Sequence, residues 1–520
     1  MSGITLDVGG LIAIDRNDRR ILSLLARAKE RAMRITIPAT ALAQAMRNPA
    51  RQVRLLRLIR QAGTALLTLH RPDATAVALV LTRTGTADIV DAYIAVCATS
   101  DPADLRRIAP GLTLIIVYKT PPRLRLDIIR PMKNLVLLTL LAAAQLPAQD
   151  RYARLLRDIL IFDAHIDTPH YFVDEGYRLR DEHKYYELDI PRMRKGKLGA
   201  VMFGLYAQPQ DFPPERWLPR ALETLEALHA EVAANKQDME FAYTAADVER
   251  IHKSGKLAAM ASLEGGHLIA DSLGVLRVFH RLGVRYMTLA HFASNNFSDS
   301  MTGIEIHRGL SKFGRELVGE MNRIGMIIDV SHISDKAVLD AVENSRAPVI
   351  ASHSSVKAIA PIVRNMPDSV IQTIAKRGGV ICINFHAGYL EKAAYDVYFR
   401  NRQARDEEIK AVSDKKPVNW EQVRAIQQKY FDKMPKVDHK VLLRHIDHVA
   451  KLAGADHVAL GSDFDGISGM TPTGMEDVSK YPVLVKGLIE MGYSDTDIRK
   501  IMGLNLLRVL RQTEEVAKQK

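Results

Sequence analysis

Cysteine and long apolar runs are scarce in this sequence. Only two cysteines occur in 520 residues, Cys97 and Cys382, which excludes both a disulfide framework and a cysteine-rich zinc module. Any metal ion must therefore be held by histidine and carboxylate side chains. The apolar run of residues 135–144 is far shorter than the ~20 residues that span a bilayer, so we expect no transmembrane span.

The composition is that of an ordinary globular protein. Hydrophobic residues make up 47% and charged residues 25%, which excludes a mainly disordered, collagen-like or multi-span membrane chain. The length indicates more than one domain, at about 150 residues each. The net charge of +12 is uneven, because residues 1–131 contain 20 Lys and Arg against 10 Asp and Glu. This asymmetry predicts two units with different partners.

Residues 119–150 are expected to separate the two units. The segment YKTPPRLRLDIIRP, residues 118–131, has paired prolines and scattered charge, as a linker does. MKNLVLLTLLAAAQLPAQD, residues 132–150, has the basic start, apolar run and small-residue ending of a secretory signal peptide. Because a signal belongs at an N-terminus, we interpret this as a fusion of two reading frames, natural or constructed. A buried helix of the linker is the alternative.

This interpretation predicts a different cellular location for each of two forms of the chain. A chain begun at Met132 is expected to be secreted or periplasmic, because the signal would then stand at its N-terminus. The full-length chain is expected to stay in the cytoplasm.

From residue 159 onward, strand-like runs alternate with helical stretches. Eight such units predict an α/β fold, a (β/α)8 TIM-type barrel over residues 151–520. A polar helical insertion at about 393–435 separates the last two runs. The eight runs cover residues 159–165, 198–206, 257–265, 284–291, 325–332, 347–353, 378–385 and 456–463.

Polar side chains fall at the ends of six of these runs. In a barrel the carboxyl ends of the strands meet at one face, where active sites form. A single histidine there is usually a satisfied core residue, but a shared pattern over six ends indicates a site. The residues are His165, Asp167, Glu264, His291, His332, His353 and Asp463.

These residue types predict a metal centre. His165 and Asp167 lie on the same side of an extended segment, and imidazole with carboxylate favours zinc over magnesium or calcium. Together with His332 and His353 they would complete one four-ligand site, and Glu264 is left over as a carboxylate that can bridge a second ion. Two ions about 3.5–4 Å apart fit better and generate hydroxide at neutral pH. The pattern therefore predicts a hydrolase.

Residues 161–510 resemble the membrane (renal) dipeptidase family of zinc peptidases. The matching segments are FDAHIDTP, SLEGGH, YMTLAHFASNNFSDS, GLSKFGRELVGEMNRIGMIIDVSHIS, PVIASHSSVKAI, RNMPDSVI, GGVICINF and HIDHVAKLAGADHVALGSDFDG. The resemblance implies hydrolysis of dipeptides by two Zn²⁺ ions with a bridging hydroxide. It also implies that His165 and Asp167 bind one zinc, His332 and His353 the other, and that the catalytic Glu264 bridges them.

The resemblance assigns three further roles. His291 would hold the scissile carbonyl, Arg364 would bind the substrate carboxylate, and Asp463 would carry a proton to the leaving amine. Ala164 and Ile166 stand where the family commonly has Gly and Asn. These departures leave open the dipeptide preference and the acceptance of D-residues or β-lactams; a homodimer is also left open.

Residues 4–117 resemble a PIN domain, the fold of many toxin ribonucleases. LDVGGLIAIDRNDRRIL, RITIPATALAQAMR, GTADIVDAYIA and TSDPADLRRI carry the resemblance, and alternating apolar and helical runs predict a small α/β domain with a parallel sheet over residues 1–118. The fold would gather Asp7, Asp91 and Asp101, with Asp88, around Mg²⁺ or Mn²⁺. RNA or an antitoxin would be its partner.

Two departures favour a weak or inactive nuclease. Gln44 stands where many members have a metal-binding Glu, and the strand that normally precedes Asp101 has no room. Two rival functions remain for the whole chain: a PIN-type ribonuclease with the barrel as a passenger, and a non-catalytic binding protein on a barrel scaffold. The second would not need all five ligands.

Overall fold

The computed structural model describes residues 3–5, 34–38, 64–67, 148–415 and 417–519. The chain divides into two units, residues 1–139 and 140–520. In the first unit three short strands pair in parallel, in the order β1 (Gly3–Thr5), β2 (Arg34–Pro38), β3 (Thr64–Leu67). They agree with the parallel sheet expected there.

Most features predicted for the first 147 residues lie outside the described residues. These are the PIN metal residues, the Gln44 departure and nearly all of the signal-like segment. The PIN resemblance, its metal site and its nuclease activity therefore stay predictions. The predicted metal residues are Asp7, Asp88, Asp91 and Asp101.

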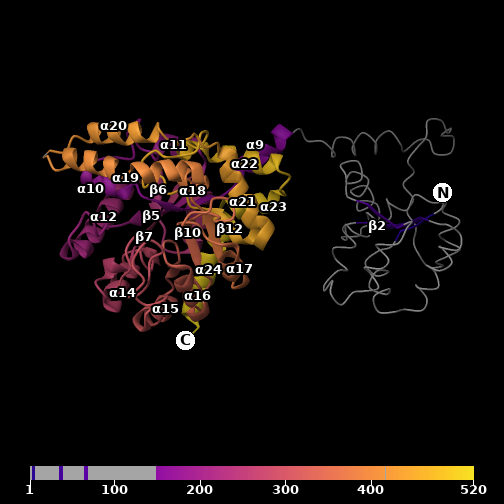
Figure 1. Ribbon diagram of the computed structural model, residues 1–520, viewed down its shortest axis with the longest axis horizontal. Coiled ribbons are helices and arrows are strands. Elements are labelled where there is room, and N and C mark those ends of the chain that lie inside the picture. The colour runs from indigo at the N-terminus through magenta and orange to yellow at the C-terminus, as the bar shows by residue number, and fades with distance from the viewer. Residues whose placement is uncertain (1–2, 6–33, 39–63, 68–147, 416, 520) are drawn as a thin grey trace. The chain divides into compact units, whose positions relative to one another are not determined.

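The second unit contains a closed barrel of eight parallel strands, as the sequence predicted. Neighbouring strands follow the order β5-β4-β12-β11-β10-β9-β8-β7, and a pairing between β5 and β7 closes the ring. Figure 1 shows helices surrounding these strands. The strands are β4 (Ile161–Ile166), β5 (Leu198–Leu205), β7 (Leu257–Glu264), β8 (Val284–Thr288), β9 (Ile327–Asp329), β10 (Ile350–Ser354), β11 (Val380–Ile383) and β12 (Val458–Leu460).

The strand sequences explain their burial. Every residue of β5 and β7 is buried, and both read as nearly continuous apolar runs, as expected for parallel strands covered on both faces. On β7, Ala258 and Met260 pack in one hydrophobic cluster, and Glu264 shares their face because strand side chains alternate. The apolar strand thus carries its carboxylate to one end of the barrel interior.

Two details differ from the predicted strands. A short strand, β6 (Met239–Phe241), pairs with the start of β7 and was not predicted. Strands β8, β9 and β12 end earlier than predicted, before His291, His332 and Asp463. His332 and Asp463 have positive φ angles, 67° and 63°, which are incompatible with an extended strand.

A buried carboxylate joins the first and last barrel strands. Asp163 on β4 accepts hydrogen bonds from the backbone N–H of Ser462, which follows β12, at 3.0 Å, and from the hydroxyl of Tyr481. Asp163 and Ser462 are 299 residues apart in the sequence. This contact helps to fix the register at which the ring closes.

Helices alternate with the strands, and several begin at side chains that accept first-turn N–H groups, as N-caps do. Ser311, Ser334 and Asp438 do this for α15, α16 and α21. The helices are α9 (Ala148–Asp158), α10 (Pro169–Asp174), α11 (Ile190–Lys195), α12 (Pro214–Ala234), α13 (Ala245–Lys253), α14 (Leu273–Arg281), α15 (Lys312–Ile324), α16 (Asp335–Asn344), α17 (Asp368–Lys376), α18 (Ala387–Leu390), α19 (Lys392–Ser413), α20 (Trp420–Phe431), α21 (His439–Ala453), α22 (Tyr481–Glu490), α23 (Asp495–Arg499) and α24 (Asn505–Lys518).

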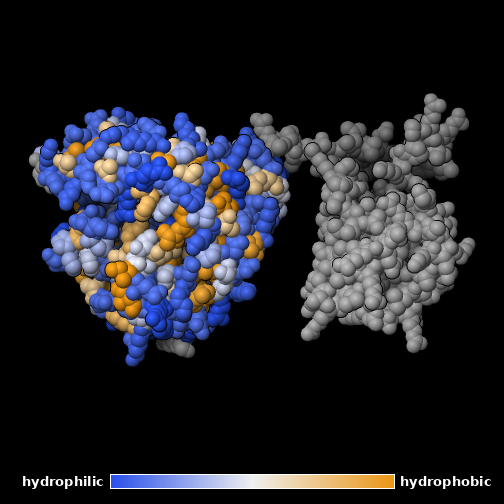
Figure 2. All heavy atoms as spheres, viewed as in Figure 1, coloured by the Kyte–Doolittle hydropathy of each residue, from blue (hydrophilic) through white to orange (hydrophobic). Residues whose placement is uncertain are grey.

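The predicted insertion is a helix pair. α19 and α20 pack on each other between β11 and β12, and Figure 1 shows them as neighbouring orange helices. Among the described residues, no helix combines the length and apolar character that a membrane span requires. Figure 2 shows that hydrophilic residues cover most of the visible face of the barrel unit, with smaller hydrophobic groups between them.

Candidate metal centre

The ends of the barrel strands bring the predicted polar residues into one buried cluster. Within the part of the chain that the structure describes, three overlapping groups have ligand atoms within 4.8 Å of one another. Glu264 and His165 each belong to two of the groups. The groups are His165, Glu264 and His353; Glu264, His291 and His332; and His165, Asp167 and Asp463.

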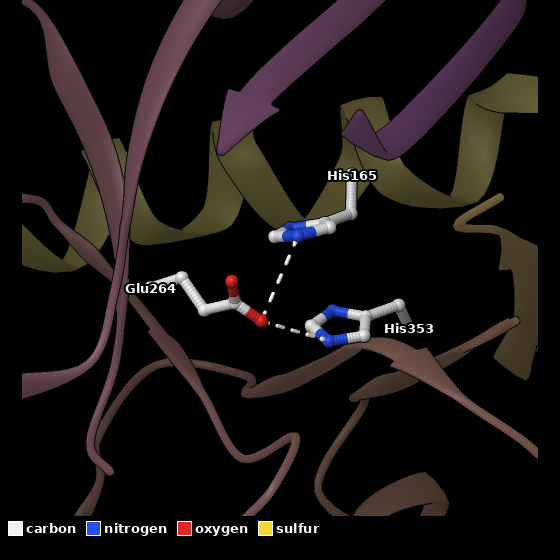
Figure 3. A group of neighbouring side chains, drawn as sticks. All are labelled: His165, Glu264 and His353. Atoms are coloured by element: carbon white, nitrogen blue, oxygen red, sulfur yellow. Dashed lines mark ion pairs between the residues drawn. The ribbon is translucent and has the colours of Figure 1, made fainter. Parts of the chain in front are cut away.

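Glu264 lies at the centre of this cluster. Its Oε1 is 3.2 Å from the Nε2 atoms of both His332 and His353. The same oxygen is 3.4 Å from His291 Nε2 and 3.7 Å from His165 Nε2. Figure 3 shows Glu264 pointing toward His165 and His353 from a different strand. Four imidazole nitrogens therefore converge on one carboxylate oxygen.

The other side of the cluster holds Asp167. Its Oδ1 lies 3.1 Å from His165 Nε2, and Asp463 Oδ1 lies 4.0 Å from the same nitrogen. His165 Nε2 and Asp167 Oδ1 are both buried, and neither has a well-formed hydrogen bond to a described residue. Buried polar atoms usually have partners. Buried histidine and carboxylate atoms that lack hydrogen-bond partners fit a site for a cation.

The electrostatics of the cluster also favour a cation. Burial and the charge of Asp167 raise the pKa of Glu264 well above its ordinary value, and raise that of Asp463 to about 7. Burial alone would lower the pKa of His165, but its contact with Tyr286 and the charges of Asp167 and Glu264 outweigh burial and raise that pKa well above its ordinary value. Burying these carboxylates in their ionised form costs free energy, and a bound metal ion would offset that cost.

The other three histidines are neutral at neutral pH. Burial, followed by nearby positive charges, lowers the pKa values of His291, His332 and His353 well below the ordinary value. Neutral imidazole is the form that binds metal ions. His332 Nε2 and His353 Nε2 are only 2.8 Å apart, so both atoms face the same position.

Arg364 lies directly behind one of these histidines. It is 2% exposed; its Nη2 donates to the carbonyl of His353 at 2.8 Å and its Nη1 to Ser354 Oγ at 3.1 Å. The guanidinium lies over the ring of Tyr389, and its Nε has no partner among the described residues. A buried guanidinium with a free donor suits a substrate carboxylate.

Asp463 is the most accessible carboxylate of the cluster. Its side chain is 13% exposed, against 5% for Asp167 and 4% for Glu264. Asn384, just after β11, donates to Asp463 Oδ2 at 2.9 Å, which leaves Oδ1 facing His165. This arrangement suits a group that exchanges protons with solvent.

Sequence reasoning did not identify the hydroxyl groups behind the histidines. Tyr286 Oη contacts His165 Nδ1, and Ser352 Oγ lies 2.7 Å from His353 Nδ1. Both residues lie within segments that carry the family resemblance, but no role was assigned to either of them. Strand alternation was the one signal that could have indicated their inward position.

A closed (β/α)8 barrel with a buried histidine and carboxylate cluster at its strand ends is the arrangement of a metal-dependent hydrolase. Residues 149–520 match the family model described as membrane dipeptidase, peptidase family M19. The chain belongs to this family, as the sequence predicted for its barrel.

Individual relatives and solved structures agree with this family assignment. The chain is 38% identical to the dipeptidase tcpJ of Claviceps purpurea over 338 residues, 64% of this chain and 70% of the relative. It is 34% identical to the uncharacterized dipeptidase C965.12 of Schizosaccharomyces pombe over 395 residues, 72% and 85% of the two chains.

Among solved structures, the probable dipeptidase PvdM of Pseudomonas aeruginosa matches with a TM-score of 0.62 and 27% identity, covering 71% of this chain and 99% of that one. A metallopeptidase of Rhodobacter sphaeroides, liganded with a phosphinate mimic of the dipeptide L-Ala-D-Ala, matches with a TM-score of 0.56 and 26% identity, covering 68% and 99%. The family and these relatives support a metallopeptidase with dipeptidase activity.

Proposed function

We propose that the barrel hydrolyses dipeptides with a pair of zinc ions. The convergence of four imidazole nitrogens on Glu264 Oε1 carries this proposal, because a carboxylate in that position can bridge two ions. His165 and Asp167 would hold one ion, and His332 and His353 the other. Glu264 would be shared between them.

Each remaining residue would have a separate task. When bound, a zinc pair supplies hydroxide at neutral pH and polarises the scissile carbonyl. His291, which is not required by either ligand pair, would hold the carbonyl oxygen. Asp463 would deliver a proton to the leaving amine, since an amine leaves only when protonated; Asn384 would orient its carboxyl group.

The substrate is proposed to be a dipeptide with a free C-terminal carboxylate. The Nε of Arg364, which has no partner among the residues that the structure describes, supports this, because a buried guanidinium favours an anionic partner. The dipeptide mimic in the Rhodobacter sphaeroides metallopeptidase supports the same substrate class.

Metal content and turnover test the proposal together. Wild-type protein reconstituted with zinc should contain two ions per chain and cleave dipeptides. Glu264→Gln should lose activity and at least one ion while remaining folded. The surface variant Glu249→Gln should keep both its activity and its ions. One ion or none in the reconstituted wild type would contradict the bridging role.

A second pair of measurements tests carboxylate binding. Arg364→Ala should mainly raise KM, and amidation of the substrate's C-terminus should slow the wild-type enzyme. Equal rates on the free and amidated dipeptide would rule out the role of Arg364.

A further inference from the structure

Two proposed zinc ligands are each backed by a hydroxyl group that contacts Nδ1 of the imidazole ring. We propose that Tyr286 and Ser352 are positioning residues that orient His165 and His353 through Nδ1, and that Ser352 also keeps a proton on Nδ1 of His353, which leaves Nε2 of that ring free for a metal ion. This inference rests on the proposed function, because it concerns the ligands of the same site.

The contacts of Ser352 determine the direction of its hydrogen bonds. The carboxylate of Asp329 receives the N–H of Ser331 at 3.0 Å and the N–H of Ser352 at 2.8 Å on Oδ1. Its Oδ2 receives the hydroxyls of Ser352, at 2.7 Å, and Thr288. Asp329 acts only as an acceptor here, and a serine hydroxyl has one proton to give.

The oxygen of Ser352 must therefore accept a hydrogen bond from His353 Nδ1, which lies 2.7 Å away. A neutral imidazole carries one N–H. With that proton on Nδ1, the lone pair is on Nε2, the atom 3.2 Å from Glu264 Oε1. The hydrogen bonds from His353 to Ser352 and from Ser352 to Asp329 thus leave Nε2 of His353 available to a metal ion.

Tyr286 supports His165 through a single contact. Its hydroxyl contacts Nδ1 of His165. Nε2, on the far side of that ring, lies 3.1 Å from Asp167 Oδ1, so the contact with Tyr286 orients the ring toward the proposed metal position.

The other two histidines lack this support. Nδ1 of His291 and of His332 has no partner among the described residues. His332 is held through its backbone instead, because its carbonyl accepts from Met301 N at 2.8 Å and Ser300 Oγ at 3.2 Å. Each proposed ligand pair thus contains one histidine with a hydroxyl support, His165 in one and His353 in the other.

A purely structural role would explain less. Ser352 is already satisfied as a donor by Asp329, so burial alone does not require its second short contact with His353. Tyr286 and Ser352 are both 0% exposed. Their removal should therefore affect the metal ions more than a comparable buried or half-buried hydroxyl elsewhere.

The test measures metal affinity separately from catalysis. Ser352→Ala and Tyr286→Phe should each weaken zinc binding, measured by chelator competition, about 10–100-fold, the usual effect of removing a partner of a ligand histidine. Controls are Ser345→Ala, which removes a buried hydroxyl bond to Ala347 O, and Tyr493→Phe, which removes one to Asp447. Both controls should bind zinc like the wild type.

A second measurement does not depend on variants that fold. In zinc-free wild-type protein at neutral pH, ¹⁵N NMR of labelled histidine should assign the proton of neutral His353 to Nδ1. A proton on Nε2, or zinc affinities of both variants within twofold of the controls, would overturn the proposal. A wild type that binds two ions with the expected tautomer but cleaves no dipeptide would refute only the proposed function.

Discussion

Gly204 on β5 lies so close to Asp167 that no side chain fits at position 204. A Cβ there would be 2.1 Å from Asp167 Oδ1 and 2.9 Å from His165 Cε1, distances that real Cβ atoms do not adopt. A glycine in a strand marks such a close approach. The absence of a side chain at one position thus makes room for two proposed ligands from the neighbouring strand.

Gly204→Ala should therefore displace Asp167 and His165 and weaken zinc binding about 10–100-fold. The matched control is Gly319→Ala in α15, where a Cβ would meet nothing within 4 Å. The control should retain wild-type zinc affinity. Equal zinc content and affinity in both variants would show that the ligands do not need the space at Gly204.

Asp463→Asn should lower turnover roughly 10²- to 10⁴-fold, the range for loss of a general acid or base. Zinc content should not change, because Asp463 is proposed as a proton carrier. The exposed Asp414→Asn serves as a control. Loss of zinc from Asp463→Asn would make Asp463 a ligand, as its position near His165 and Asp167 allows.

Glu187 and Asp465 form a buried carboxyl pair that should make stability depend on pH. Glu187 N donates to Asp465 Oδ1 at 2.7 Å, and Asp465 N donates to Glu187 Oε2. Burial and the charge of Asp465 raise the pKa of Glu187 well above its ordinary value, and burial raises the pKa of Asp465 to about 6. The folded pair therefore binds protons more tightly than the unfolded chain does.

This difference in proton binding determines how stability changes with pH. The pair's contribution to stability is complete below pH ~4 and is lost as the pH rises through about 6. Between pH 5 and 8, Glu187→Gln should lose less unfolding free energy than the wild type, by on the order of 1–3 kcal/mol, since a tenfold change in proton affinity is worth about 1.4 kcal/mol. Urea unfolding at both pH values measures this, with the exposed Glu182→Gln as control. Identical pH dependence in Glu187→Gln and the wild type would contradict it.

Export tests the interpretation of residues 132–150. We expect the full-length chain to remain in the cytoplasm of a bacterium, and a chain begun at Met132 to be exported and cut near residues 148–150. Cell fractionation and mass spectrometry of the mature N-termini distinguish the two. Export of the 520-residue chain would refute the expectation that the signal acts only at an N-terminus. A Met132 form that stays uncut in the cytoplasm would refute the interpretation of residues 132–150 as a signal peptide.

The sequence predicted the barrel and the clustering of its polar strand ends because both depend on local periodicity. Apolar runs identify buried parallel strands, and parallel strands bring their ends together whatever the loops do. The early ends of β9 and β12 were not predictable, because the positive φ angles of His332 and Asp463 come from tertiary packing. The three residues of β6 are too few to show a period.

The residues around the ligands were harder to recognise. Tyr286, Ser352 and Gly204 are ordinary strand residues in sequence, and their roles depend on contacts with distant segments. The Glu187–Asp465 pair spans 278 residues. Such relationships require the register between strands, which a single sequence does not contain.

The bond from Asp163 to Ser462, 299 residues apart, has a consequence for protein synthesis. All five proposed zinc ligands precede β11, so they leave the ribosome before the strand that ties β4 into the ring. A chain stopped before β12 would carry every ligand, but it would lack Asp463 and the closure that aligns the ligands. Zinc binding should therefore begin only after β12 has been synthesised, and a nonsense mutation before β12 should abolish zinc binding although it removes no ligand.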